Sequence, residues 1–304
     1  MLHALRTLRH SSVSLLILFV LVFVMIRILP GDPARLMAGA TASEDQIAEI
    51  REQMGLDLPV WGQLVVYAGR LLQGDLGIST VNSRPVHAQI IDGLGYSVPL
   101  LICAMALAVL LGVPAGTVGA VRRNRPSDVI ITSLAVAATS IPAFWLGLVL
   151  IDWLAVRWRL LPTSGAGTWQ HMVMPAVVLA CTQVGLIARL TRGSVIEVLQ
   201  ADYIRTARSK GVGFAGLLFW HVARNAAVPT VTVIGLQTGM LLGGAVVTES
   251  VFNWPGVGRL LIQAVLYRDY PMIQGLILLF GITFVLINLT VDLVNMMIDP
   301  RLRT

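Results

Sequence analysis

Long apolar runs, separated by short polar and basic stretches, make up most of this 304-residue chain. A helix that crosses a membrane needs about 20 mostly apolar residues, because the hydrocarbon core of a bilayer is about 30 Å thick. Six segments meet that length, at residues 11–29, 97–120, 128–152, 171–190, 228–248 and 274–298. None of them alternates apolar and polar positions as the strands of a membrane barrel do. The pattern therefore predicts an all-α membrane protein with six spans.

The longest polar segment, residues 30–95, follows the first apolar run. Ser43 and Gln46 have the spacing of a capping box, ahead of a short helix that should end near Gly55. A second helix should follow, with one apolar face formed by Trp61, Leu64, Val65, Ala68 and Leu72. We expect this segment to form a small cap of amphipathic helices on the outer surface.

Composition agrees with a membrane protein. The chain is 56% hydrophobic and 12% charged, whereas soluble domains average about 45–50% apolar and about 25% charged residues. Its net charge of +6 comes from basic residues scattered in short clusters, which does not indicate nucleic-acid binding. Arg122, Arg123 and Arg125 lie in a short loop after the second apolar run, and short cytoplasmic loops are enriched in such residues. We therefore expect a plasma-membrane protein with both termini in the cytoplasm.

The chain has the features of one membrane domain with an inserted outer cap. Its first residues resemble a signal peptide, with Arg6 and Arg9 before an apolar run, but no cleavage motif follows. We expect an uncleaved first span instead. The expected parts are an N-terminal span at 1–29, the outer cap at 30–95, a five-span core at 96–298 with a cytoplasmic loop at 191–227, and a cytoplasmic tail at 299–304.

The sequence lacks the motifs of nucleotide or metal chemistry. Its single lysine, Lys210, is flanked by Ser209 and Gly211, so the phosphate-binding pattern G-x-x-x-x-G-K-[ST] is missing. The five histidines form no pair with metal-ligand spacing, and Cys103 and Cys181 lie inside apolar runs. We expect no catalytic activity, no metal site and no cofactor.

A basic, glycine-punctuated stretch, ADYIRTARSKGVGFAGLLFWHVARNA at 201–226, separates two apolar runs. A helix from about Val195 to Lys210 should stop at Gly211, and a second helical segment should then lead into the next span. This predicts a short helix–turn–helix that projects into the cytoplasm. A solvated connector would not need its apolar side chains, which are Phe214, Leu217, Leu218, Phe219 and Trp220. They indicate a surface that docks on the helix bundle or on a partner.

The stretch ADYIRTARSKG resembles the cytoplasmic loop of ABC importer permeases, in which glutamate, two alanines and three further residues precede a glycine. Counted back from Gly211, the glutamate position holds Arg205 and the alanine positions hold Thr206 and Ala207. Arg224 stands where the general pattern has a proline; this departure and the missing glutamate both fit the peptide branch, and the form RTARSKG is similar to the peptide and nickel branch. Further motifs extend the resemblance, to the first permease of dipeptide and oligopeptide importers, over nearly the whole chain: LPGDPA, GDLGIST, SIPAFWLG, GGAVVTESVFNWPGVGRLL, RDYP and DPRLR.

The resemblance implies a type I ABC importer fold and a permease that performs no chemistry itself. It implies a heterodimer with a second, similar permease, two ATP-binding subunits and an extracytoplasmic substrate-binding protein. The residues that it assigns to ATPase coupling are Asp202, Tyr203, Arg205, Thr206, Ala207, Arg208, Lys210 and Gly211. The expected substrates are dipeptides or oligopeptides. A nickel or metal-chelate permease, or a non-conducting membrane assembly protein, remain as alternatives.

Two glycine-containing segments add candidate sites. Gly235, Gly239 and Gly243 recur every four residues along the fifth apolar run, as on faces where membrane helices approach closely. They predict either a helix-packing face or a pore lining or gate. Trp254, Pro255 and Gly256 lie just outside that run. They predict either an interfacial turn or part of the outer mouth beneath a binding protein.

Overall fold

A computed structural model of the chain describes residues 12–24, 33–39, 42–53 and 55–298. These residues are almost entirely helical; their only β-type pairing is an isolated bridge between Ile78 and Pro85, so the all-α prediction is confirmed. The described chain forms two compact units. The first is built around Val98–Trp254 and the end of the last helix, from Leu286; the second contains the segment up to Ser97 together with Pro255–Val285.

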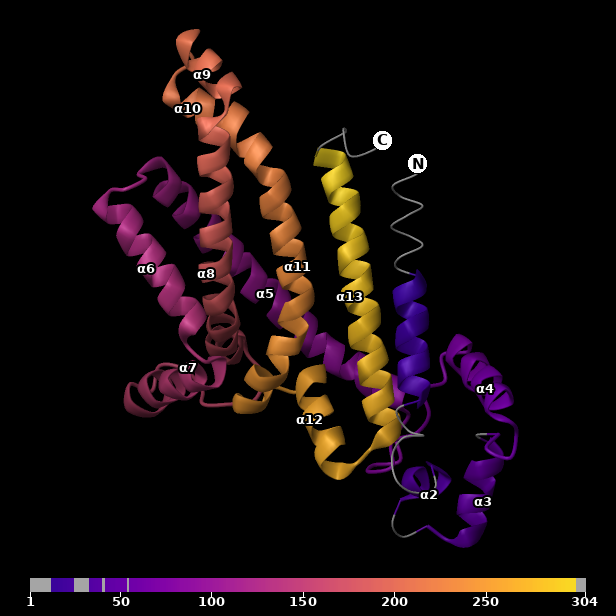
Figure 1. Ribbon diagram of the computed structural model, residues 1–304. Helices are drawn as coiled ribbons and strands as arrows, with labels where there is room; N and C mark the ends of the chain where they lie inside the picture. The colour runs from indigo at the N-terminus through magenta and orange to yellow at the C-terminus, as the bar shows by residue number, and fades with distance from the viewer. Residues whose placement is uncertain (1–11, 25–32, 40–41, 54, 299–304) are drawn as a thin grey trace. The chain divides into compact units, whose positions relative to one another are not determined.

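The first unit is a helical bundle (Figure 1). Helix α5, which begins in the second unit, runs into it, and α13 ends in it. Its elements are α5 (Val86–Val121), α6 (Pro126–Ser140), α7 (Ala143–Leu150), a π-helical segment (Ile151–Arg157), α8 (Trp169–Gln200), α9 (Asp202–Ser209), α10 (Phe214–Gly216), a second π-helical segment (Leu217–Val222), α11 (Ala223–Val251) and α13 (Tyr270–Ile298).

Four helices in the described part of the chain are long and apolar enough to cross a membrane: Val86–Val121, Trp169–Gln200, Phe214–Val251 and Tyr270–Val294. They correspond to the second, fourth, fifth and sixth predicted spans. Residues 86–95, expected in the outer cap, belong to α5. Of the first predicted span, Ser12–Val24 forms a shorter apolar helix, and the rest of 11–29 lies outside the described residues.

The third predicted span is not one straight helix. The chain bends by 97° between Pro126–Ser140 and Ala143–Arg157, so a continuous helix over 128–152 is wrong, and the two helices form either a broken span or a re-entrant loop. The break is at Ile141, whose backbone is extended (φ −78°, ψ 122°) and precedes Pro142. A residue before proline is disfavoured in the helical conformation because the proline ring crowds its backbone. The apolar pattern of the segment hid this local signal.

Small side chains on α5 allow it to pack closely on α8. Every fourth residue is small and buried: Ala104, Ala108, Gly112, Gly116 and Ala120. A Cβ atom on Gly112 would come 2.9 Å from Ile187 Cγ2, and one on Gly116 would overlap the carbonyl oxygen of Ala188. Such faces let helix backbones approach within a membrane, where packing rather than hydrophobic burial drives association. This stripe of small residues was not among the sequence predictions.

The second unit contains the polar segment. Its elements are the helix Ser12–Val24, α2 (Pro33–Ala38), α3 (Glu44–Gln53), α4 (Val60–Leu72), the first part of α5, α12 (Val257–Tyr267) and the first part of α13. The predicted capping box is confirmed: the Ser43 amide donates to Gln46 Oε1 (3.0 Å) and the Gln46 amide donates to Ser43 Oγ (3.3 Å). Gly55 has φ +63°, as expected where α3 ends.

Candidate functional site

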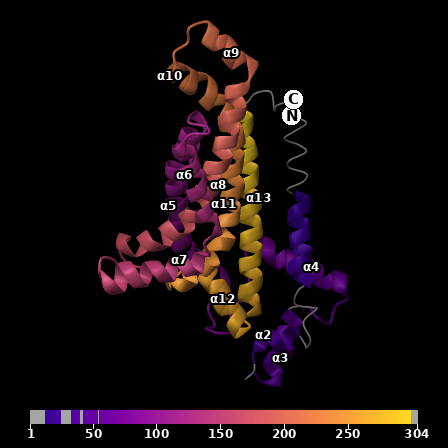
Figure 2. The ribbon, with the colours of Figure 1, turned by 60° about the vertical axis from the view of Figure 1, so that its left-hand side comes forward.

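The basic stretch forms a hairpin, residues 201–222, between the end of α8 and the start of α11 (Figures 1 and 2). The prediction of one helix from Val195 to Lys210 is wrong, because α8 ends at Gln200 and Ala201 is extended (φ −69°, ψ 145°). Helix α9 begins anew at Asp202, whose carboxylate suits a helix N-terminus. This break turns α9 back so that its apolar side chains can be buried on the bundle.

Gly211 closes the turn after α9. It has φ +81°, and its amide donates to the Arg208 carbonyl (3.0 Å). Glycine occupies the left-handed region without the steric penalty of a side chain. No atom lies within 4 Å of the place where a Cβ would be, so conformation rather than space favours glycine here. The predicted helix stop at Gly211 is confirmed.

The inner side of the hairpin is apolar. Ile204 and Ala207 are the buried residues of α9. They belong to one cluster whose other buried members are Ala120, Val195, Leu217, Val222 and Ala226. Ala207, expected to contact an ATPase, therefore packs on its own chain. This packing holds α9 against the bundle, and the assignment of Ala207 to ATPase coupling stays a prediction.

The outer side of the hairpin carries the remaining residues assigned to coupling, all exposed: Asp202, Tyr203, Arg205, Thr206, Arg208, Lys210 and Gly211. Three cations and one carboxylate give this face a net positive charge. Phe214, which begins α10, is also exposed. The hairpin thus has an anchored apolar side and a cationic side open for contact.

An ion pair that the sequence analysis missed joins α6 to α8 near the hairpin. Arg192 donates to Asp128 through Nε (2.6 Å) and Nη2 (2.8 Å), and the backbone amide of Asn124 donates to Asp128 Oδ2 (2.9 Å). Asp128 is buried. Sequence marks only one half of this arrangement, because proline at the first position and an acid in the first turn are typical of a helix start.

The three glycines of α11 that the sequence singled out, Gly235, Gly239 and Gly243, are not equivalent. Gly235 and Gly239 are buried, whereas Gly243 is exposed. A Cβ on Gly235 would overlap the side chain of Val291 in α13, so this glycine permits close helix packing. No atom lies within 4 Å of a Cβ position on Gly243. The helix-packing interpretation fits Gly235, and the role of a pore lining or gate stays a prediction.

The residues expected at an outer mouth are largely covered. Trp254 is 5% exposed and packs in the largest apolar cluster of the first unit, with Leu100 and Leu241 among its members. Gly256 is buried and Pro255 is half-buried. Trp254 is therefore a core side chain in this structure.

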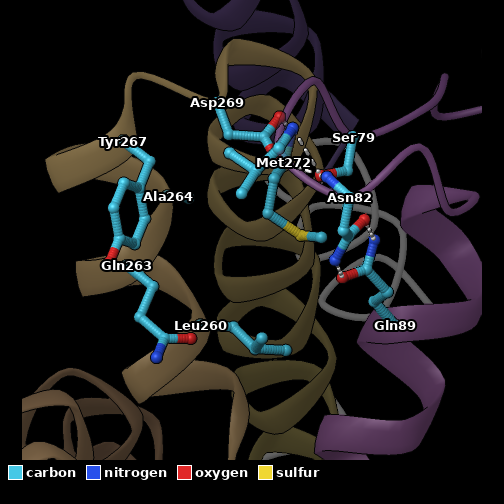
Figure 3. Close-up of a pocket in the computed structure, with 10 residues that line it drawn as sticks. Ser79, Asn82, Gln89, Leu260, Gln263, Ala264, Tyr267, Asp269 and Met272 are labelled. Carbon is cyan, nitrogen blue, oxygen red and sulfur yellow. Dashed lines mark hydrogen bonds between the residues drawn. The ribbon is translucent and has the colours of Figure 1, made fainter.

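A pocket of about 140 Å³ in the second unit joins two of the quoted motifs (Figure 3). Ser79, in GDLGIST, donates its hydroxyl hydrogen to Asp269, in RDYP, although 190 positions separate them. The amide of Met272 also donates to Asp269 (3.4 Å), which places the carboxylate at the start of α13. Across the pocket from α12, Asn82 and Gln89 exchange side-chain hydrogen bonds of 2.7 and 3.1 Å. The side of the pocket opposite α12 is therefore held in place by hydrogen bonds between its own polar side chains.

Comparisons with known proteins agree along the whole chain. Residues 108–304 match the family "Binding-protein-dependent transport system inner membrane component", and residues 1–101 match its N-terminal family. The glutathione transport system permease proteins GsiC of Escherichia coli strain K12 and of Shigella dysenteriae serotype 1 are each 47% identical over 290 residues, covering 95% of both chains.

Solved structures show a similar fold at low identity. A chain of the inward-facing MetNI methionine ABC transporter matches with a TM-score of 0.60 and 18% identity, over 69% of this chain and 96% of that one. A chain of an amino acid ABC transporter matches with a TM-score of 0.52 and 18% identity, over 70% of this chain and 94% of that one.

Proposed function

Because this chain belongs to the family of binding-protein-dependent transport system inner membrane components, we propose that it forms half of a peptide-conducting pore and that its hairpin receives the force of ATP hydrolysis. The chain is a multi-pass permease subunit of an ABC importer and has the type I importer fold. Such importers contain a partner permease, ATPase subunits and a substrate-binding protein.

The proposed substrates are short peptides, with glutathione as the first candidate. The support is the 47% identity over 290 residues to permeases of glutathione transport systems, which extends over nearly the full length of both proteins. Glutathione is itself a tripeptide, so this relationship favours the peptide interpretation over a nickel chelate. We further propose that the pore is a heterodimer with a second, similar permease, served by two ATPases.

The single observation that carries the coupling proposal is the two-sided hairpin. Ile204 and Ala207 fix α9 to the bundle, while Arg205, Arg208 and Lys210 remain exposed. A cationic face suits an acidic groove on an ATPase, because complementary charge steers association and sets orientation. Since the hairpin continues through the π-helical segment into α11, force applied to α9 would reach α8 and α11 directly.

Two parallel helices support a proposal for the orientation of the chain. Gly112 approaches Ile187 and Gly116 approaches Ala188, so α5 and α8 run in the same direction and end on the same side. The basic loop after α5 and the hairpin after α8 therefore share one membrane face. Short loops rich in arginine lie in the cytoplasm, so we propose that the hairpin and both termini are cytoplasmic.

Uptake by the reconstituted complex tests the proposal. The permease pair, ATPases and binding protein would be assembled in vesicles and supplied with radiolabelled glutathione, a dipeptide or a nickel chelate. We expect ATP-dependent uptake of glutathione or the dipeptide, and none of the nickel chelate. Uptake of the chelate alone would refute the peptide assignment, and a fully assembled complex that moves none of the three would refute conduction of these solutes.

A further inference from the structure

Helix α4 exposes apolar side chains, whereas a helix on a water-exposed cap would expose polar ones. Its exposed side chains are all apolar: Val60, Trp61, Val65 and Leu72. Trp61, Val65 and Leu72 are 78%, 71% and 90% exposed and share one stripe, because the spacings 4 and 11 are close to whole helical turns. Trp61, Val65 and Leu72 belong to the apolar face that the sequence predicted for this helix. A contiguous exposed apolar stripe of this kind marks a surface that contacts protein or membrane.

The longer polar side chains of α4 turn toward the chain itself. Gln63 Nε2 donates to the carbonyl oxygens of Leu56 (3.1 Å) and Leu58 (2.9 Å). Arg70 donates to Asp75 at 2.8 Å, beside the C-terminal end of the helix. Partial burial raises the pKa of Asp75, but the Gly77 amide and the Arg70 guanidinium outweigh it and leave that pKa below its usual value. Polar groups are thus paired within the chain while apolar ones face outward.

Aromatic contacts with the helix Ser12–Val24 fix the position of α4 along that helix. Tyr67 stacks on Phe19 with ring centroids 5.3 Å apart and lies 5.8 Å from the ring of Phe23. Figures 1 and 2 both show α4 beside this helix, the indigo ribbon that precedes it in the chain. Tyr67 therefore holds α4 against the flank of an apolar helix.

That apolar helix lies along α13, which is long enough to cross the membrane. Gln274 Nε2 donates to the Val22 carbonyl oxygen (3.0 Å), and a Cβ on Gly281 would overlap the side chain of Leu18. Leu18 and Val22 are thus level with the first turns of α13. Because Phe19 and Phe23 flank Val22, Tyr67 and α4 lie at the same level, near one end of a membrane span.

The surface of the helix next to α4 is also suited to contact with lipid. The helix Ser12–Val24 exposes only apolar large side chains, namely Val13, Leu16, Ile17, Val20, Leu21 and Val24. The stripe on α4 extends this apolar surface. Tryptophan is enriched where membrane helices meet the headgroups, and an amphipathic helix can lie in that plane with its apolar face toward the acyl chains.

We infer that α4 is an interfacial membrane helix that lies in the outer leaflet, with Trp61, Val65 and Leu72 in contact with lipid. Its occupant is the bilayer, and the helix does not belong to a water-exposed cap. This position anchors the segment between the first apolar helix and α5 to the membrane surface. The leaflet follows from the orientation proposed above; contact with lipid does not depend on it.

Spin labels on single cysteines test this inference. In a chain with Cys103 and Cys181 replaced by alanine, Val65→Cys and Leu72→Cys place labels on the stripe. Gln73→Cys is the matched control, because it is exposed, polar and adjacent to Leu72. The complete transporter would be reconstituted in vesicles of phosphatidylethanolamine and phosphatidylglycerol. Collisions of each label would be measured with oxygen, which concentrates in lipid, and with a water-soluble nickel chelate.

We expect labels at 65 and 72 to collide several-fold more with oxygen than with the nickel chelate, and the label at 73 to show the reverse. Chelate collisions at 65 and 72 equal to those at 73 would place α4 in water and overturn the inference. Labels at 65 and 72 that meet neither reagent would be covered by a protein partner, which would also overturn it. ATPase stimulation by loaded binding protein confirms that each labelled complex is assembled.

Discussion

Ala207 and Arg208 are neighbours on α9 but have different surroundings. Ala207 is 9% exposed and packs in the apolar cluster beneath the hairpin, whereas Arg208 is exposed on its cationic face. Substitutions at the two positions should therefore act by different routes. A charge at Ala207 would be buried and cost about 1–3 kcal/mol or more, which lowers the stability of the hairpin. A charge change at Arg208 acts only on what contacts the hairpin.

Reversing the charge of Arg208 tests the cationic face. We expect Arg208→Glu to weaken ATPase binding about tenfold, equivalent to about 1.4 kcal/mol, and to reduce transport without reducing the amount of permease in the membrane. Arg224→Glu is the control, because it changes the net charge by the same amount and Arg224 is exposed at the start of α11. Binding would be measured with detergent-purified permease pairs and ATPases. Equal weakening by both variants would show only a general charge effect.

A comparison of Gly211 with Gly193 separates the effect of backbone conformation from the effect of the space around the Cβ position. Neither has an atom within 4 Å of its Cβ position, but only Gly211 has a positive φ. Gly211→Ala should destabilise the turn by about 1–2 kcal/mol, because a side chain is disfavoured in the left-handed region. Gly193→Ala lies within α8 and should be neutral or stabilise by about 0.5–1 kcal/mol.

The rate of tryptic cleavage within the hairpin of the reconstituted complex measures this difference, since Arg205, Arg208 and Lys210 are cleavage sites there. Gly211→Ala should be cut faster than the unmodified chain, and Gly193→Ala should not. Equal rates for all three chains would mean that the turn does not depend on glycine.

At the level of elements, the link between α6 and α8 determines how the hairpin is supported. Arg192 precedes the end of α8 at Gln200 by little more than two helical turns. The Asp128 carboxylate accepts hydrogen bonds from the Arg192 guanidinium and from the Asn124 amide, so it joins α8 to the start of α6. Its side chain is 5% exposed and that of Arg192 is 27% exposed. We expect this ion pair to matter more than pairs on the surface.

Asp128→Asn should destabilise the complex by about 3 kcal/mol, near the lower end of the range for breaking a buried pair. The control is Asp75→Asn, which removes the partner of Arg70 in an exposed pair and should cost at most about 1 kcal/mol. Thermal aggregation of the purified complex measures both effects. An Asp75→Asn loss as large as that of Asp128→Asn would contradict the assigned importance of burial.

Across the whole molecule, the proposed membrane orientation rests on the parallel course of α5 and α8 and on the arginine-rich loop after α5. The segment before α5 and the hairpin after α8 should then lie on opposite faces of the membrane. In a chain without its native cysteines, Gln73→Cys should react with an impermeant thiol reagent in whole cells, and Ser209→Cys should react only after the membrane is opened. Both positions are exposed, so access to the reagent differs by side alone. Labelling of position 209 in intact cells would refute the orientation.

Much of the chain could be predicted from local signals. The apolar runs predicted four of the helices long enough to span, and the Ser43–Gln46 box and the Gly211 turn formed as expected. Such features depend on bonds within one or two turns of a helix. The apolar run at 128–152 indicated one continuous helix, but the extended backbone of Ile141, before Pro142, breaks it.

The sequence by itself determined the class of protein, its main helices and the family that its motifs resemble, because hydrophobic length and short motifs are properties of consecutive residues. Only the tertiary structure decided which small residues bring helices together, that Asp128 pairs with Arg192 across 64 positions, and that Ala207 faces its own bundle. It also decided that the apolar face of α4 points outward. Lipid is as apolar as a helix interface, so hydrophobicity alone does not distinguish a side chain that meets lipid from one that meets another helix.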